Sequence, residues 1–178
     1  DDTVVVVSAL GGLTDKLIAV AGIAAARGDW RTEMKAIADR HYFIIDSMVK
    51  DSCRHATTET VACLLGELSR TYEAVSLLGD IPSKTLDVIV SFGERMSAPI
   101  VAGIIEGARL HNSLDFIKTE KWFDKNIADV NLTRDLILKE FTACSNGPHV
   151  TGGFIAQDRD SGEITNLGRG GSDFTASL

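Results

Sequence analysis

The sequence has few of the residues that mark several broad classes of protein. Only three of its 178 residues are proline and hydrophobic residues make up 44%, which argues against intrinsic disorder. Lysine and arginine (18) are outnumbered by aspartate and glutamate (25), so there is no basic stripe with which to bind nucleic acid. The net charge of −7 does not exclude an anionic small molecule, because such a ligand responds to the local field of its cleft. No apolar run reaches the ~18 residues of a membrane span and no signal peptide is visible, so we expect no membrane partner.

Cysteine is also scarce. Cys53, Cys63 and Cys144 are an odd number without paired spacing, and we interpret them as reduced thiols of a cytoplasmic protein, with Cys63 buried in a helix. No Cys/His pair has zinc-site spacing, so we predict no metal ligands and interpret His41 and His55 as surface or helix-end residues. The length suits a single domain with a sizeable core.

The first segment predicts a strand, a glycine turn and a helix. Residues 3–9 are mostly valine without alternation, which predicts a strand buried on both faces within a parallel sheet. A central strand rarely opens a domain, so we expect a further segment upstream. A helix over 15–27 follows, with Thr14 or Asp15 as its cap. Ser8 and Thr14 would face the crevice at the carboxyl end of the strand, although Thr14 could serve only as a cap. The glycines match neither the dinucleotide fingerprint nor the P-loop.

Helical periodicity dominates the next part of the chain. Helices over 30–51 and 57–78 form a helical excursion from the sheet at about 28–79. This excursion is either a lobe over the site or a subunit contact. Ser83 is predicted to cap another helix, which Gly93 interrupts, and Pro99 opens the next one. Glu94 lies between two apolar segments, where its carboxylate is exposed, paired with Arg95, or directed into a cleft.

The remaining elements alternate between strand and helix. We predict a strand over 112–117, a loop or short helix over 118–125, a helix over 133–141, a turn over 146–148, a strand over 149–157 and a hairpin turn over 158–162. The whole pattern predicts an α/β protein, a three-layer α/β/α sandwich with a mostly parallel mixed sheet.

The end of the chain has the most informative local pattern. Gly168, Gly170 and Gly171 surround Arg169, and Ser172 and Asp173 follow. This pattern predicts a flexible turn leading into a helix that Ser172 or Asp173 caps. The free N–H groups of a helix N-terminus and a guanidinium both suit a carboxylate or phosphate. The alternative is a glycine-rich surface loop with a solvated arginine.

Several of these motifs, taken together and in order, resemble the aspartate kinases of the amino-acid kinase family. They are Val-Val-Val-Ser8-Ala-Leu-Gly-Gly-Leu-Thr14, Ser91-Phe-Gly-Glu94-Arg-Met-Ser-Ala98, Gly153-Phe-Ile and Leu167-Gly-Arg169-Gly-Gly-Ser172-Asp173-Phe-Thr-Ala176. The stretch Ser76-Leu-Leu-Gly79 is more similar to the kinase part of bifunctional aspartate kinase–homoserine dehydrogenases.

The resemblance implies ATP-dependent phosphorylation of the L-aspartate β-carboxylate to aspartyl phosphate, the first step toward lysine, threonine and methionine. It implies ATP with Mg²⁺ carried on the nucleotide, and a homo-oligomer. Arg169 would bind the substrate α-carboxylate and Glu94 its ammonium, with Ser8, Thr14 and the segment Gly170-Gly171-Ser172 also binding aspartate. Ser172 and Asp173 would lie near the nucleotide, and Asp173 would be the catalytic acidic residue beside the transferring phosphate.

The sequence departs from the family in two places. The family's opening strand ends in Lys-Phe-Gly-Gly, and this motif is absent, as is the nucleotide-binding part that follows Asp173. We therefore expect residues 1–178 to be a partial aspartate kinase domain with little kinase activity alone. A hydroxamate assay that measured near-normal aspartyl phosphate formation by this chain would refute that expectation.

Two other interpretations remain open. A relative acting on glutamate or acetylglutamate would share the fold, although the segment Ser91-Phe-Gly-Glu94 argues against it. The other interpretation is a non-catalytic piece that binds an amino acid or that assembles through the helical excursion.

Overall fold

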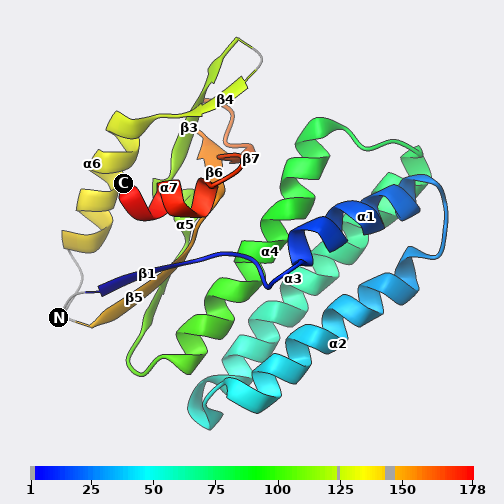
Figure 1. The fold of residues 1–178 in the computed structure, drawn as a ribbon, viewed down its shortest axis with the longest axis horizontal. Helices are drawn as coiled ribbons and strands as arrows, with labels where there is room; N and C mark the ends of the chain where they lie inside the picture. The colour runs from blue at the N-terminus through cyan, green and yellow to red at the C-terminus, as the bar shows by residue number, and fades with distance from the viewer. Residues whose placement is uncertain (1–2, 124, 143–146) are drawn as a thin grey trace.

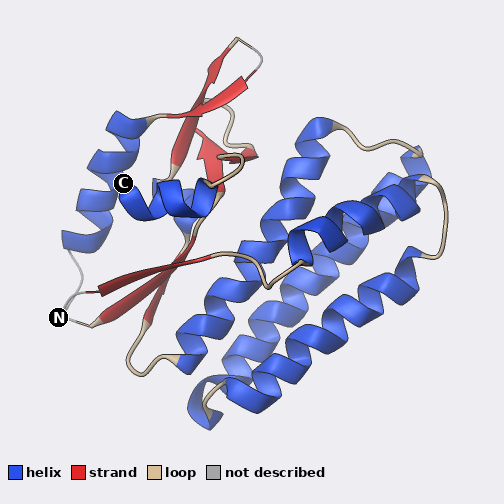
Figure 2. Cartoon of the chain, viewed as in Figure 1, coloured by secondary structure: helices blue, strands red, loops and turns tan. Residues whose placement is uncertain are grey.

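The computed structural model describes residues 3–123, 125–142 and 147–178. Figure 1 shows a lobe of long helices beside a lobe built on strands, and Figure 2 shows that helix predominates. The elements in chain order are β1 (Thr3–Val7), α1 (Leu13–Ala25), α2 (Trp30–Met48), α3 (Asp51–Leu78), α4 (Ser83–Ile104), β2 (Arg109–His111), α5 (Ser113–Phe116), β3 (Lys118–Trp122), β4 (Lys125–Ala128), α6 (Val130–Thr142), β5 (Pro148–Gly152), β6 (Ile155–Asp158), β7 (Ile164–Asn166) and α7 (Gly171–Ser177).

The strands form one parallel and one mixed sheet. The first has the order β1-β5-β2 with both pairs parallel, and the second has the order β4-β3-β6-β7, in which only β3 and β6 are parallel. Helix α4 packs against β1, β2, β5 and β7, while α6 and α7 lie on the other side of the strands (Figure 1). The predicted α/β class, with parallel and mixed sheets between helices, is therefore confirmed, as is the hairpin turn between β6 and β7.

The helical excursion is also confirmed. Helices α1 to α4 share one apolar core, in which Tyr72 is fully buried and donates a hydrogen bond to the carbonyl of Leu17 at 3.0 Å. The α3 helix ends at Gly79, whose φ of 71° is the left-handed conformation that closes helices and that glycine adopts at least cost. Among the described residues, none of these helices combines the length and the apolar character that a membrane crossing requires.

Two long-range predictions about the helices and strands are wrong. Strand β1 is an edge strand that pairs with β5 alone among the described residues, so its valines are only half-buried and Val4 is 48% exposed.

Helix α4 runs unbroken through Gly93 and Pro99. A proline inside a helix costs about 3 kcal/mol locally, but almost every residue from Ile89 to Ile100 is buried, and this packing keeps α4 continuous.

Local predictions also fail where tertiary contacts decide the outcome. Residues 112–117, expected as a strand, contain the short helix α5, and the strand β2 ends just before them. Residues 118–125, expected as a loop or short helix, contain β3 and the first residue of β4. The strand expected over 149–157 is split into β5 and β6, and Pro82 rather than Ser83 is the N-cap of α4, without a side-chain bond. The turn over 146–148 begins at a residue outside those described.

The expected burial of two residues also needs revision. His41 is fully buried rather than exposed, and its Nδ1 lies 2.7 Å from the Ile37 carbonyl. Cys63 is exposed, because the buried stripe of α3 runs through Val61, Leu65 and Leu68 instead. Cys144 lies outside the described residues.

Gly93 allows α4 to approach the loop after β1, and this approach gives a test of the packing. A Cβ at position 93 would lie 2.6 Å from the Ala9 Cβ, whereas one at Gly22, on an exposed face of α1, would meet nothing within 4 Å. We expect Gly93→Ala to lower the free energy of unfolding by about 1–3 kcal/mol. The control Gly22→Ala should raise it by about 0.5–1 kcal/mol, through helix propensity.

Urea denaturation of both variants measures the two effects. If the two substitutions changed the free energy of unfolding in the same direction, the close contact between α4 and the β1–α1 loop would be contradicted.

Candidate functional site

Three segments far apart in the sequence meet around one open pocket of about 480 Å³. The segments are the β1–α1 loop, the middle of α4 and the turn before α7, which lie where the two lobes face each other (Figure 1). Every residue predicted for the site lines this pocket, namely Ser8, Thr14, Glu94, Arg169, Gly170, Gly171, Ser172 and Asp173.

Glu94 is the buried acidic residue of this pocket. Its side chain is on α4, the residue is 3% exposed, and its Oε1 accepts a hydrogen bond from the Ala9 N–H at 3.0 Å. Its Oε2 is also buried, and no group in the described part of the chain forms a hydrogen bond with it. Burial raises the pKa of this carboxyl to about 7, because the charged form loses its hydration. A cationic donor from a ligand would satisfy Oε2 and favour the carboxylate.

The carboxyl end of β1 is held against α4 by two contacts besides the one to Glu94. Ser97 Oγ donates a hydrogen bond to the Ser8 carbonyl at 2.8 Å, and Gly93 leaves room for Ala9. Arg95, predicted as one partner for Glu94, pairs instead with Glu67 at 2.9 Å. The Glu94 carboxyl is therefore directed into the protein rather than to the surface, and of the three predicted environments the cleft is the one observed.

Two helices begin at this pocket with the same turn. The N-caps of α1 and α7 are Gly12 (φ 74°, ψ 1°) and Gly170 (φ 74°, ψ 11°), and neither helix has a side-chain cap. In both helices the first N–H donates a hydrogen bond to the carbonyl three residues earlier. Leu13 donates to the Leu10 carbonyl at 2.8 Å, and Gly171 donates to the Gly168 carbonyl at 3.0 Å.

The predictions that Thr14 or Asp15 caps α1, and that Ser172 or Asp173 caps α7, are therefore wrong. Glycine in the left-handed conformation makes the turn instead, so those side chains are not used as caps. The next N–H groups of each first turn have no intrahelical acceptor and can bind an anion.

Arg169 supplies a cation to the pocket that the buried carboxyl also lines. Its side chain is exposed, and within residues 3–123, 125–142 and 147–178 no acidic group forms an ion pair with it. A guanidinium can bind a carboxylate through two parallel hydrogen bonds. The pocket thus contains a cation, a buried acid and two helix N-termini, which together suit a ligand bearing both an ammonium and carboxylate groups.

Phe154 is a pocket residue that the sequence analysis did not single out. Its φ of 63° is in the left-handed region, where a bulky side chain costs on the order of 1–3 kcal/mol. Its carbonyl accepts from the Leu167 N–H at 2.8 Å, and its N–H donates to Thr175 Oγ1 at 3.3 Å, which ties the β5–β6 corner to α7.

Gly153 makes this close approach possible, since a Cβ there would lie 2.7 Å from the Ser172 Cα. The adjacent glycines 152 and 153 were the signal for this corner in the sequence, but they do not reveal that the next residue turns into the pocket.

No group of three metal-ligating side chains is found in the described parts of the chain. Mg²⁺ often binds through one or two carboxylates and substrate phosphates. Asp15 and Asp173 are exposed carboxylates on this pocket, so its residues fit an ion that arrives on a nucleotide.

The sequence matches the model of the amino acid kinase family over residues 1–178. The chain belongs to the amino acid kinase family. Among curated proteins it is similar to aspartokinase 1, chloroplastic, of Arabidopsis thaliana, with 26% identity over 99% of this chain and 32% of the relative. It is 29% identical to the lysine-sensitive aspartokinase 3 of Escherichia coli over 98% of this chain and 38% of that protein.

The similar solved structures are also aspartate kinases. The fold matches E. coli aspartokinase III in complex with aspartate and ADP, with a TM-score of 0.82, 27% identity, and 98% of this chain and 39% of that chain covered. A match to Clostridium acetobutylicum aspartate kinase (TM-score 0.73, 20% identity, 98% and 36% covered) extends the similarity in fold. The chain thus spans between about a third and two fifths of the length of the aspartokinases it matches.

Proposed function

We propose that this chain forms the L-aspartate-binding part of an aspartate kinase, which transfers the γ-phosphoryl group of ATP to the substrate β-carboxylate. The observation that carries the proposal is the pocket itself, which Glu94, Arg169 and two helix N-termini without side-chain caps line together. Within the described ranges, Glu94 Oε2 has no hydrogen-bond partner and the Arg169 guanidinium has no ion pair. The match to an aspartokinase solved with aspartate and ADP supports it.

The roles follow from charge. Arg169 binds the α-carboxylate as a bidentate pair, and Glu94 accepts a hydrogen bond from the ammonium. Ser8, Thr14 and Ser172 supply further polar contacts from the rim, and the first-turn N–H groups of α1 and α7 face the β-carboxylate. Phe154 closes one wall.

The chemistry needs positioning more than proton transfer. The nucleophile is already a carboxylate, so no general base is required, and the difficulty is to bring two anions together. Backbone N–H groups and Arg169 offset that repulsion. Mg²⁺, bound with the nucleotide, would neutralise phosphate charge, and Asp173 with Gly170 and Gly171 lies on the side of the pocket where we place the phosphate.

The proposal also covers the nucleotide, the length of the active chain, its oligomeric state and its location. ATP binding is supported by the ADP in the similar structure, and the activity belongs to a chain longer than residues 1–178. The homo-oligomer stays a prediction, as does the resemblance to bifunctional enzymes. The expected cytoplasmic location stays a prediction too, since the relatives include a bacterial and a chloroplastic protein.

Calorimetry with a small ligand panel tests the proposed site. We expect the chain to bind L-aspartate, and to bind N-acetyl-L-aspartate about tenfold more weakly or worse, since the acetyl group removes the ammonium and leaves the buried Glu94 unpaired. L-Glutamate, one methylene longer, should also bind more weakly. Equal binding of the acetylated ligand, or a preference for glutamate, would contradict the proposal.

A further inference from the structure

A second cavity, of about 240 Å³, adjoins Glu94 and plays no part in the proposed reaction. It lies between α3, α4 and the corner from β2 to α5, whereas the aspartate pocket lies between the β1–α1 loop and the turn before α7. Glu94 is the residue that lines both. The residues of the second cavity are Thr60, Leu64, Glu94, Arg95, Ala98, Pro99, Leu110, His111, Asn112, Ser113, Gly152 and Ile155.

Two buried side chains of this cavity each have one oxygen without a hydrogen-bond partner. Ser113 is 2% exposed and Glu94 is 3% exposed, and among the described residues no group bonds to Ser113 Oγ or to Glu94 Oε2. Gly152 lies beside both residues, since a Cβ there would be 3.3 Å from the Glu94 Cβ and 3.6 Å from Ser113 Oγ. Buried polar groups are almost always hydrogen-bonded, so two unpartnered oxygens on residues that line one cavity mark a place for a donor.

The charged groups around the cavity favour a cationic donor. Arg95 is engaged by Glu67 at 2.9 Å and lies over the Phe92 ring at 4.5 Å. His111 is engaged on both ring nitrogens, by Glu140 at 2.7 Å and by His149 at 2.9 Å. An anion in this cavity would therefore face side chains that are already engaged, whereas an ammonium would face the open oxygen of Glu94.

The rest of the lining is apolar. The cavity is also lined by aliphatic surface from Leu64, Pro99, Leu110 and Ile155. The volume of about 240 Å³ is below the range of about 300–1,000 Å³ typical of drug-sized ligands. A cavity of this volume suits a small ammonium group, with its several N–H donors, on a chain of a few carbons.

We propose that this cavity binds a small primary ammonium compound with a short aliphatic chain, held by Glu94 Oε2 and Ser113 Oγ. The coupling to the reaction rests on the proposed function. Because one carboxylate oxygen would serve both ammonium groups, the bound amine competes with L-aspartate although the two ligands occupy different cavities.

The test uses n-propylammonium chloride as the probe and tetramethylammonium chloride as its control, since the control carries the same charge without an N–H donor. Both are titrated into the isotope-labelled 178-residue chain while the backbone amide NMR signals are recorded. We expect saturable shifts at Ser113 and Gly152 with n-propylammonium alone. Ser113→Ala should weaken that binding about tenfold, and Gly152→Ala, which adds a methyl group 3.6 Å from Ser113 Oγ, should also weaken it. Ser47→Ala, at an exposed position on α2, should not.

The amide spectra also report whether each variant is folded. Shifts with tetramethylammonium equal to those with n-propylammonium, or unchanged binding in both Ser113→Ala and Gly152→Ala, would overturn the site.

A separate calorimetric titration tests the coupling. We expect n-propylammonium to raise the apparent Kd of L-aspartate, and an unchanged Kd at saturating amine would overturn the competition. Failure of the proposed function would be distinct, since L-aspartate would then not bind in the absence of amine, while the NMR shifts at Ser113 would persist.

Discussion

Replacing Arg169 with alanine is expected to weaken L-aspartate binding by about 2–4 kcal/mol, roughly 30- to 700-fold in Kd. The physical reason is that Arg169 supplies the unpaired cation of the pocket, so the substrate α-carboxylate would lose both hydrogen bonds of a bidentate pair. Isothermal titration calorimetry on the wild-type and variant chains measures the difference directly.

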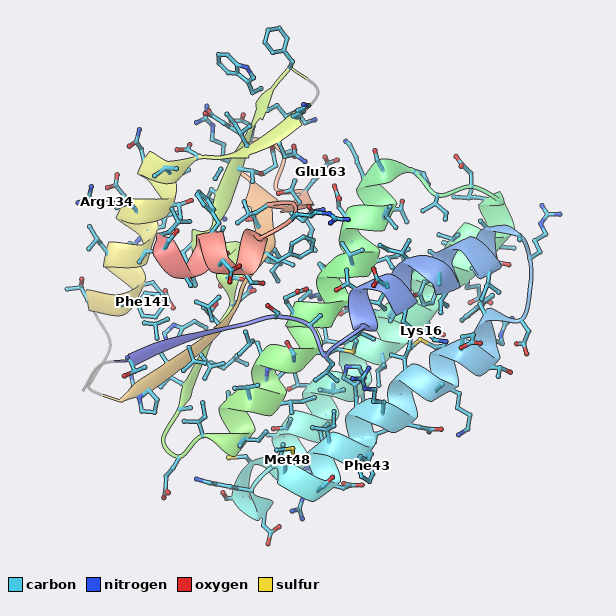
Figure 3. All side chains as sticks on the ribbon, in the orientation of Figure 1. Lys16, Phe43, Met48, Arg134, Phe141 and Glu163 are labelled. Atoms are coloured by element: carbon cyan, nitrogen blue, oxygen red, sulfur yellow. The ribbon has the colours of Figure 1, made fainter. Side chains whose placement is uncertain are left out.

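Arg134→Ala is the matched control for this experiment. Arg134 is exposed on α6, its side chain points outward from the sheet lobe in Figure 3, and it does not line the pocket. The control changes net charge equally, so it reports any general electrostatic effect. Equal losses in the two variants, or an unchanged Kd in Arg169→Ala, would remove Arg169 from the binding site.

Glu94→Gln is expected to stabilise the chain at high pH while it weakens aspartate binding. Below pH 4.5 the Glu94 carboxyl is protonated in both the folded and the unfolded state, so its ionisation has no effect on stability. Between pH 4.5 and about 7 the unfolded carboxyl ionises while the folded one keeps its proton, so the free energy of unfolding falls as pH rises. A pKa raised from 4.5 to about 7 corresponds to a loss of about 3 kcal/mol that is complete above pH 7.

The glutamine variant has no such ionisation. Its amide oxygen can still accept the Ala9 N–H, so we expect its free energy of unfolding to exceed that of the wild type by up to about 3 kcal/mol at pH 8 and to equal it near pH 4. Urea denaturation at the two pH values measures this. Glu106→Gln is the control, because its side chain is 95% exposed and should show no pH-dependent difference. A glutamine variant less stable than the wild type at pH 8 would contradict the burial cost assigned to Glu94.

Aspartate binding should follow the opposite trend. The substrate ammonium needs the ionised carboxylate, so the affinity of the wild-type chain should rise with pH up to about 7 and then level off. Glu94→Gln should bind weakly at every pH. A buried carboxylate that lowers stability but is needed for binding would be the trade-off expected of a functional site.

The sequence was most informative about the site. Gly93 beside Glu94 allows a close approach, Gly12 and Gly170 make the turns before α1 and α7, and the structure brings all three segments to one pocket. The residue types alone predicted an anion near Arg169 and left three environments open for Glu94. The ligand with both charges was predicted from the resemblance to the aspartate kinases. The caps were predicted wrongly because the pattern does not distinguish a serine that caps a helix from one that faces a ligand.

The rest of the fold depended on contacts that no local pattern contains. Pro99 continues a helix because its surroundings are buried, and residues 118–122 form a strand because β4 and β6 pair with it on both sides. The valines of β1 have the composition of a central strand, yet β1 lies at the edge of its sheet in the described structure. Position within a sheet is set by partners far along the chain.

A crystal structure of the chain grown with L-aspartate tests the central claim most directly. The account predicts one aspartate molecule in the pocket between the β1–α1 loop and α7, with its α-carboxylate on the Arg169 guanidinium and its ammonium on Glu94 Oε2. Aspartate bound elsewhere, or bound in this pocket with neither Arg169 nor Glu94 in contact with it, would contradict the account.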